Sequence, residues 1–78
     1  MLDYFKAHIQ QYDVEFNRIS YSAFDNWYHL TVKINEAEVS YRMGLNAKGA
    51  WEIKTPRLSP IIFGLETRCR EEILKNEV

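Results

Sequence analysis

The side chains in this sequence that are best suited to binding or catalysis are aromatic and basic. Phe24, Trp27, His29, Arg42 and Lys54 combine two large rings, an imidazole and two cations. Rings and arginines are enriched where proteins dock, because they bury a large area and bond with defined geometry. We therefore expect these five residues to form a partner-binding surface if the fold gathers them on one face.

The same region supports a second interpretation, which is contact with nucleic acid. The segment from Arg42 to Arg57 contains four basic residues, among them Lys48, against one acidic residue. Cations that meet phosphates beside rings that stack on bases are the combination used by single-strand binders. The whole chain has a net charge of -1, so no global field favours nucleic acid or an anionic membrane. Lys48 and Arg57 are the added candidates for nucleic-acid contact.

Catalysis would require an oriented His29 or an activated Cys69, and the sequence supports neither. With the strand pairing described below, Glu52 lies two strands from His29, about 10 Å at the usual strand spacing, which is too far for a hydrogen bond. Cys69 falls in an apolar stripe and is expected to be a small buried hydrophobe. A general-base role for His29 is therefore our weakest hypothesis. No His, Cys or carboxylate cluster, His8 included, has metal-ligand spacing, so we expect no enzyme, no metal and no cofactor.

Composition indicates one small globular domain spanning residues 1–78. The chain is 46% hydrophobic, 14% aromatic and 27% charged, whereas disordered chains are poor in aromatic residues. Its single cysteine, Cys69, excludes an intramolecular disulfide. The longest aliphatic run, residues 61–63, is too short for a signal peptide or a membrane span. We expect a cytoplasmic protein.

The first residues have the apolar spacing of a helix. Apolar residues recur three or four positions apart: Leu2, Phe5, Ile9, Tyr12, Phe16 and Ile19. This stripe predicts a helix from about Leu2 to about Asp13, followed by extended chain. Whether the first strand begins near Val14 or near Arg18 stays open.

Three short turns predict the register of an antiparallel meander. Two of them are two-residue turns of composition typical of tight hairpins, and the third is a three-residue loop with glycine in a left-handed position. These turns and the pairs they define are Asp25-Asn26 with Phe24 opposite Trp27, Asn35-Glu36 with Lys33 opposite Glu38, and Ala47-Lys48-Gly49 with Leu45 opposite Trp51. The first turn also places Ile19 opposite Val32 and Ser22 opposite His29. This register keeps apolar residues on one face.

The last part of the chain predicts a helix that begins at Ser59 and Pro60. A hydroxyl at the cap and proline at the first helical position are typical of a helix start. The apolar stripe of this helix is Ile62, Leu65, Cys69 and Ile73. Gly64 weakens the helix and suggests close packing against the sheet.

The sum is an α+β fold. We expect a four-stranded antiparallel meander with an N-terminal and a C-terminal helix packed on one face, in the order α-β-β-β-β-α. The opposite face is then open and carries the aromatic and basic candidates. On that face Trp27 lies beside Gly44, where a ring shields bare backbone. The face is either solvated or a docking surface, and both readings are compatible with that shielding.

This order of elements is similar to that of double-stranded RNA-binding domains, which have three strands. That family has a lysine-rich motif at the start of its last helix. The matching stretch here, Leu58 to Phe63, contains no lysine. The resemblance therefore implies topology alone, without the activity.

We predict from the sequence a small, non-enzymatic protein-interaction domain of the regulator or inhibitor type. It would bind a protein partner through the open sheet face or an edge strand, and the same edges could pair two copies into a homodimer. The alternative is a nucleic-acid-binding domain that uses the basic region of the last two strands.

Overall fold

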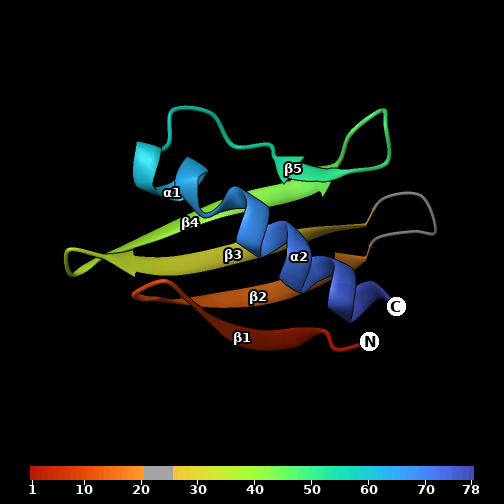
Figure 1. Ribbon diagram of the computed structural model, residues 1–78, viewed down its shortest axis with the longest axis horizontal. Coiled ribbons are helices and arrows are strands. Elements are labelled where there is room, and N and C mark those ends of the chain that lie inside the picture. The colour runs from red at the N-terminus through yellow and green to blue at the C-terminus, as the bar shows by residue number, and fades with distance from the viewer. Residues whose placement is uncertain (21–25) are drawn as a thin grey trace.

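The fold is an antiparallel sheet followed by two helices (Figure 1). A computed structural model describes residues 1–20 and 26–78. The elements are β1 (Tyr4–Ile9), β2 (Tyr12–Ser20), β3 (Asn26–Ile34), β4 (Ala37–Leu45), β5 (Trp51–Ile53), α1 (Pro60–Gly64) and α2 (Glu66–Glu77). Within the described residues the sheet has five strands in chain order, so it is a meander. The α+β class is confirmed, whereas the strand number and the position of the first helix are not.

The first 20 residues form a β-hairpin, and the predicted N-terminal helix is wrong. β1 and β2 pair with Ile9 opposite Tyr12 and Phe5 opposite Phe16. Residues 10 and 11 make the turn, with Gln10 at φ 57°. Apolar residues alternate within each strand, and the two turn residues shift the alternation so that it also fits a helical spacing. Because both helices are C-terminal, the similarity in topology to double-stranded RNA-binding domains is lost.

The pairing of β2 with β3 also differs from the prediction. Ile19 lies opposite Trp27, not opposite Val32, and Phe16 lies opposite Leu30. Asn26, which we placed in a two-residue turn, is part of β3 and faces Ser20. This register places Phe16 in the core, where it is fully buried. The predicted pairs of Ser22 with His29 and Phe24 with Trp27 involve residues 21–25, which lie outside the described residues.

The later strand pairings are confirmed. Lys33 lies opposite Glu38 across a turn in which Asn35 and Glu36 both have positive φ, 50° and 66°. Leu45 lies opposite Trp51, and the loop between them has a glycine at φ 79°. Two consecutive positive φ values match the right-handed twist of the flanking strands, which is why this type of turn is favoured in tight hairpins.

The C-terminal helices begin and pack largely as predicted. The Ser59 hydroxyl accepts a hydrogen bond from the Ile61 N–H at 3.2 Å, and Pro60 is the first residue of α1. The whole predicted stripe is buried: Ile62, Leu65, Cys69 and Ile73. Gly64 does not pack against the sheet, because a Cβ added there would meet nothing within 4 Å. The helix breaks into α1 and α2 at Leu65.

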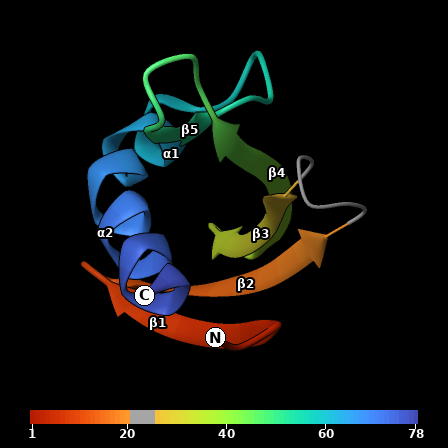
Figure 2. The same ribbon diagram turned by 90° about the vertical axis from the view of Figure 1, so that its right-hand side faces the viewer.

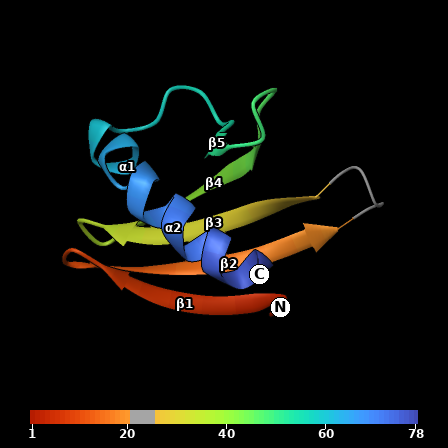
Figure 3. The same ribbon diagram turned by 45° about the vertical axis from the view of Figure 1, so that its right-hand side comes forward.

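The sheet curls around α2, which lies across its inner face (Figures 2 and 3). The core is built from inward side chains of all five strands and one side of the helices. Phe5 stacks on Phe16 with ring centroids 4.6 Å apart, and Tyr28 meets Trp51 edge to face at 5.2 Å. A single apolar face therefore holds the fold together, and no described element covers the outer face.

The β5 edge of the sheet is hydrogen bonded by side chains of α2. The Ile53 N–H donates to a Glu66 carboxylate oxygen at 2.8 Å, and the Arg70 Nε donates to the Trp51 carbonyl at 2.7 Å. Glu66 and Arg70 are one helical turn apart and also face each other at 3.9 Å. Two outward backbone groups of this short strand, the Ile53 N–H and the Trp51 carbonyl, thus have partners.

The far end of α2 holds the chain just before β1. The Asn76 side chain accepts from the Leu2 N–H at 2.9 Å and donates to the Leu2 carbonyl at 2.8 Å. A single amide thus pairs with both backbone groups of Leu2, as a neighbouring strand would. This contact brings the two termini close together (Figures 1 and 3).

Candidate functional site

Four of the five predicted partner-binding residues lie together on the outer face. His29 faces Arg42 across the β3–β4 ladder, and the Lys54 N–H continues the β5 ladder by donating to the Arg42 carbonyl at 2.8 Å. The neighbours on the other side are Asn17 and Tyr4, so Asn17 takes the place predicted for Ser22. One row therefore crosses the sheet. In strand order its residues are Tyr4, Asn17, His29, Arg42 and Lys54.

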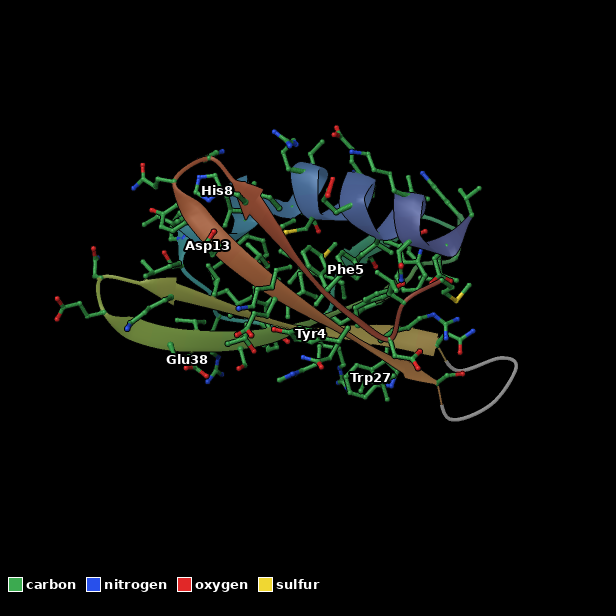
Figure 4. All side chains as sticks on the ribbon, turned by 90° about the horizontal axis from the view of Figure 1, so that it is seen from below. Tyr4, Phe5, His8, Asp13, Trp27 and Glu38 are labelled. Carbon is green, nitrogen blue, oxygen red and sulfur yellow. The ribbon has the colours of Figure 1, made fainter. Side chains whose placement is uncertain are left out.

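Trp27 forms the aromatic centre of this face. The Arg42 guanidinium lies over its ring, 4.8 Å from the centroid. A cation over an indole face at an exposed site contributes about 0.5–1 kcal/mol. Figure 4 shows Trp27 on the side of the strands that faces away from α2. Ring and cation are thus held against each other on the face that no described element covers.

The predicted position of Gly44 beside Trp27 is confirmed, and the Lys54 stem also lies next to this glycine. Gly44 lies opposite Trp27 and is buried. A Cβ added to Gly44 would meet the Lys54 stem at 3.5 Å and the Trp27 Cβ at 4.0 Å. The Lys54 stem is thus nearer to this position than Trp27 is, and shielding by the Trp27 ring stays a prediction.

The positive charge of Lys54 is offset within the site. Its ammonium donates to a Glu52 carboxylate oxygen at 2.9 Å. That hydrogen bond, and a second one from the Asn46 side chain, lower the pKa of Glu52. The carboxylate is therefore ionised at neutral pH. Arg42 is the cation that faces the Trp27 ring.

His29 lies between Asn17 and Arg42, half-buried. No hydrogen bond to its ring is found in the described part of the chain. A general base requires a group that fixes its tautomer. The geometry around His29 is that of a surface imidazole beside a guanidinium.

The remaining predicted residues lie elsewhere or outside the described chain. Phe24 falls among residues 21–25, which lie outside the described residues, so its placement on the site stays a prediction. Lys48 lies in the β4–β5 loop, where its N–H donates to the Asn46 side chain at 2.9 Å. Arg57 lies between β5 and α1, exposed and at φ 61°. Neither belongs to the row that contains Arg42.

The contribution of β1 to this face was not predicted from the sequence. Tyr4 donates to the Glu15 carboxylate at 2.5 Å, and the His8 Nδ1 lies 2.8 Å from an Asp13 oxygen. Figure 4 shows Tyr4 and the His8–Asp13 pair along the same hairpin. His8 was expected on a helix. The alternation of Phe5, Ala7 and Ile9 is the signal for a strand, which the helical spacing obscured.

A shallow hollow of about 430 Å³ lies farther along the outer face. Its lining is almost entirely charged: Lys6, Asp13, Glu15, Thr31, Lys33 and Glu38. Small-molecule pockets are mostly apolar with a few polar groups, so this lining is unlike theirs. Lys33 and Glu38 face each other across the ladder, yet form no ion pair within 4.0 Å in the described residues.

Three further findings bear on function. Within residues 1–20 and 26–78, no group of three His, Cys, Asp or Glu residues is placed to hold a metal ion. None of the helices in the same residues has the length and apolar character needed to cross a membrane. No protein-family model, curated protein or solved structure matches the chain.

Proposed function

We propose that this chain is a small, non-enzymatic protein-interaction domain of the regulator or inhibitor type, which binds a protein partner through the outer sheet face. The observation that supports this most is the Trp27–Arg42 stack at 4.8 Å on a face that no described element covers. Tryptophan and arginine are the residues most enriched among those that dominate binding energy. Their mutual contact fixes both before a partner arrives.

The surroundings of this pair suit a protein interface. Asn17 and His29 provide a polar rim, and the hydroxyls of Thr31 and Ser40 lie 3.2 Å apart in the next row. An apolar and aromatic centre with a polar border is the usual composition of a docking patch. A side chain on the partner can pack on the Trp27 ring while its carboxylate or carbonyl accepts from the Arg42 guanidinium.

Nucleic-acid binding has less support. Lys54 is bonded to Glu52, and Lys48 and Arg57 lie in connections away from the Arg42 row. Phosphate recognition relies on several cations that release counterions together. Acidic and basic side chains instead alternate on the outer face, and they also do so in the charged hollow described above.

The test is capture of a partner by the wild-type chain and by two double variants. Trp27→Ala with Arg42→Ala removes the proposed centre. The matched control is Leu74→Ala with Arg68→Ala, which removes an exposed apolar residue and an exposed arginine from α2. We expect an enriched protein to be lost at least tenfold with the first variant and retained with the second, measured by quantitative mass spectrometry.

Direct binding is then measured by calorimetry with the purified partner. Loss of about 2 kcal/mol or more on the outer-face change is expected for the centre of an interface. Equal capture by all three chains would contradict the assignment. Release of the captured material by nuclease would show nucleic acid to be the ligand. Circular dichroism of each variant checks that the fold is intact.

A further inference from the structure

In residues 1–20 and 26–78, the backbone groups of three β1 residues at the edge of the sheet have no hydrogen-bond partner. The Arg18 N–H donates to the Asp3 carbonyl at 2.8 Å, so these two residues form a hydrogen-bonded pair. Hydrogen-bonded pairs alternate with non-bonded ones along an antiparallel ladder. The other β1 residues whose backbone groups are hydrogen bonded to β2 are therefore Phe5, Ala7 and Ile9. By the same alternation the N–H and C=O groups of Tyr4, Lys6 and His8 point away from β2.

This edge differs from the one at β5. There the outward N–H of Ile53 and C=O of Trp51 are bonded by Glu66 and Arg70 of α2. Near β1, the hydrogen bonds that α2 side chains make in the described residues go to Leu2, through Asn76. In the described residues no side chain bonds the outward groups of Tyr4, Lys6 or His8. An edge with such a row is a template for another strand.

The side chains along β1 indicate what that strand would contain. On the inner side, Phe5 and Ala7 are half-buried, so apolar surface is left at the margin of the core. On the outer side, Lys6 is exposed and has no ion pair within 4.0 Å in the described chain. It faces Glu15, whose carboxylate already accepts from the Tyr4 hydroxyl. A carboxylate arriving from the open side would meet an available ammonium.

We infer that the free edge of β1 accepts an extended segment of a partner protein as a sixth strand. That segment has a carboxylate side chain opposite Lys6 and apolar side chains at the two alternate positions that face Phe5 and Ala7. The inference rests on the proposed function and specifies the form and chemistry of the partner. Backbone hydrogen bonds to Tyr4, Lys6 and His8 provide binding, and the side chains provide selectivity.

A second copy of this chain fits the edge less well. The antiparallel register that uses all three free residues pairs β1 with itself about Lys6. Each Lys6 then faces the other Lys6, and like charges directly opposite are destabilising. Sliding the register by two residues removes that clash, but it leaves one of the three free residues opposite Leu2 or Gln10. Leu2 is already bonded to Asn76.

The first experiment titrates the isotope-labelled chain with the synthetic peptide acetyl-Thr-Val-Glu-Val-Thr-amide, followed by NMR. The expected result is saturable shifts of the Tyr4, Lys6 and His8 amides, with slower hydrogen exchange at those three. A peptide with lysine in place of the central glutamate should bind about fivefold more weakly, as expected for exchanging an opposite-charge pair for a like-charge pair.

Three substitutions at one position separate backbone from side-chain effects. Lys6→Pro removes an N–H that the β1–β2 ladder does not use, and proline is tolerated on edge strands. It should weaken the glutamate peptide at least tenfold. Lys6→Thr keeps the N–H and should bind both peptides alike. Lys6→Glu should prefer the lysine peptide. The unfolding midpoint of each variant shows that the fold persists.

Three results would overturn the inference. These are no shift of the three amides up to millimolar peptide, equal binding by the proline variant, or a wild-type dimer in sedimentation that the proline variant abolishes. The proposed function is tested separately. A partner lost with Trp27→Ala and Arg42→Ala but kept with Lys6→Pro would leave the outer face as the site and remove the edge. Peptide binding without any captured partner would leave the β1 edge as a site and would leave the outer face without support.

Discussion

Glu77 joins three parts of the fold through one carboxylate. It accepts from the Arg18 Nε at 2.7 Å and from the Tyr28 hydroxyl at 2.5 Å. Burial alone would raise the pKa of Glu77, but the hydrogen bonds from Arg18 and Tyr28 outweigh it and lower the pKa overall. Burial, followed by the bond to Glu77, raises the pKa of Tyr28 to about 12. The end of α2 is thereby fixed to β2 and β3.

These shifts predict a loss of stability at both pH extremes. The carboxylate of Glu77 has a lower pKa in the folded chain, so its contribution is complete above the unfolded value and lost as pH falls through the folded one. The Tyr28 pKa is raised, so its contribution is lost between pH 10 and about 12. Glu77→Gln should lower the free energy of unfolding by about 2 kcal/mol at pH 7, as expected for hydrogen bonds to charged groups. It should also reduce the loss of that free energy, measured by urea unfolding, as the pH falls into the acid range.

A suitable control is Glu71→Gln, which removes an exposed carboxylate that lies 3.5 Å from Arg68. Exposed pairs of this kind contribute less than about 1 kcal/mol. The two variants should therefore differ clearly at neutral pH. An unchanged loss of the free energy of unfolding in acid for the Glu77 variant would show that another carboxylate controls the acid transition.

At the level of the elements, two glycines should respond to alanine in opposite directions. Gly64 ends α1, has an ordinary backbone conformation, and has open space where a Cβ would lie. Alanine there reduces the freedom of the unfolded chain and should stabilise by about 0.5–1 kcal/mol. Gly49 has φ 79°, and alanine there should destabilise by about 1 kcal/mol or more. Urea midpoints measure both, and equal signs would contradict the local geometry.

The elements that the sequence predicted are those with explicit local signals. Asn35 and Glu36 form the expected turn, Gly49 occupies the expected left-handed position, and Ser59 with Pro60 starts the helix. Each of these depends on chemistry within a few residues. The registers on both sides of β4 followed from them, so Trp27 with Gly44 and His29 with Arg42 were predictable.

The first hairpin lacks such a signal. Gln10 and Gln11 have no turn preference, and the apolar residues around them fit a helix as well as two short strands. Only the tertiary structure decides, because the inner face of β3 needs Phe16 and Val14 as neighbours. The part of the site that comes from β1 and β2, Tyr4 and Asn17, was therefore not accessible from the sequence.

At the scale of the whole molecule, α2 contacts three parts of the sheet. It covers the inner face, bonds the β5 edge through Glu66 and Arg70, and holds the start of β1 through Asn76. The helix runs across the strands from the side of β5 towards β1, so it can contact both sides of the sheet (Figure 3). In the part of the chain that the structure describes, α2 covers neither the outer face nor the outward backbone groups in the middle of β1.

Removing the two side chains at β5 should create a second open edge. Glu66→Ala with Arg70→Ala leaves the Ile53 N–H and the Trp51 carbonyl without these partners. We expect a loss of about 2 kcal/mol, since each partly buried group loses a charge-assisted bond, and self-association that increases with concentration relative to the wild type. Analytical ultracentrifugation and urea unfolding measure the two effects.

The matched control is Arg68→Ala with Glu71→Ala, an exposed pair on the same helix. It removes the same kinds of charge without touching the sheet. If both double variants sediment and unfold alike, the contacts of Glu66 and Arg70 do not protect the edge.

The hydrogen bonds from Glu66, Arg70 and Asn76 also constrain how the chain is made. A ribosome adds residues from the N-terminus, so all five strands are translated before these three side chains exist. A nascent chain that ends before Glu66 has an exposed inner face and both of its edges unpaired. Truncation within α2 should therefore yield aggregation-prone chains.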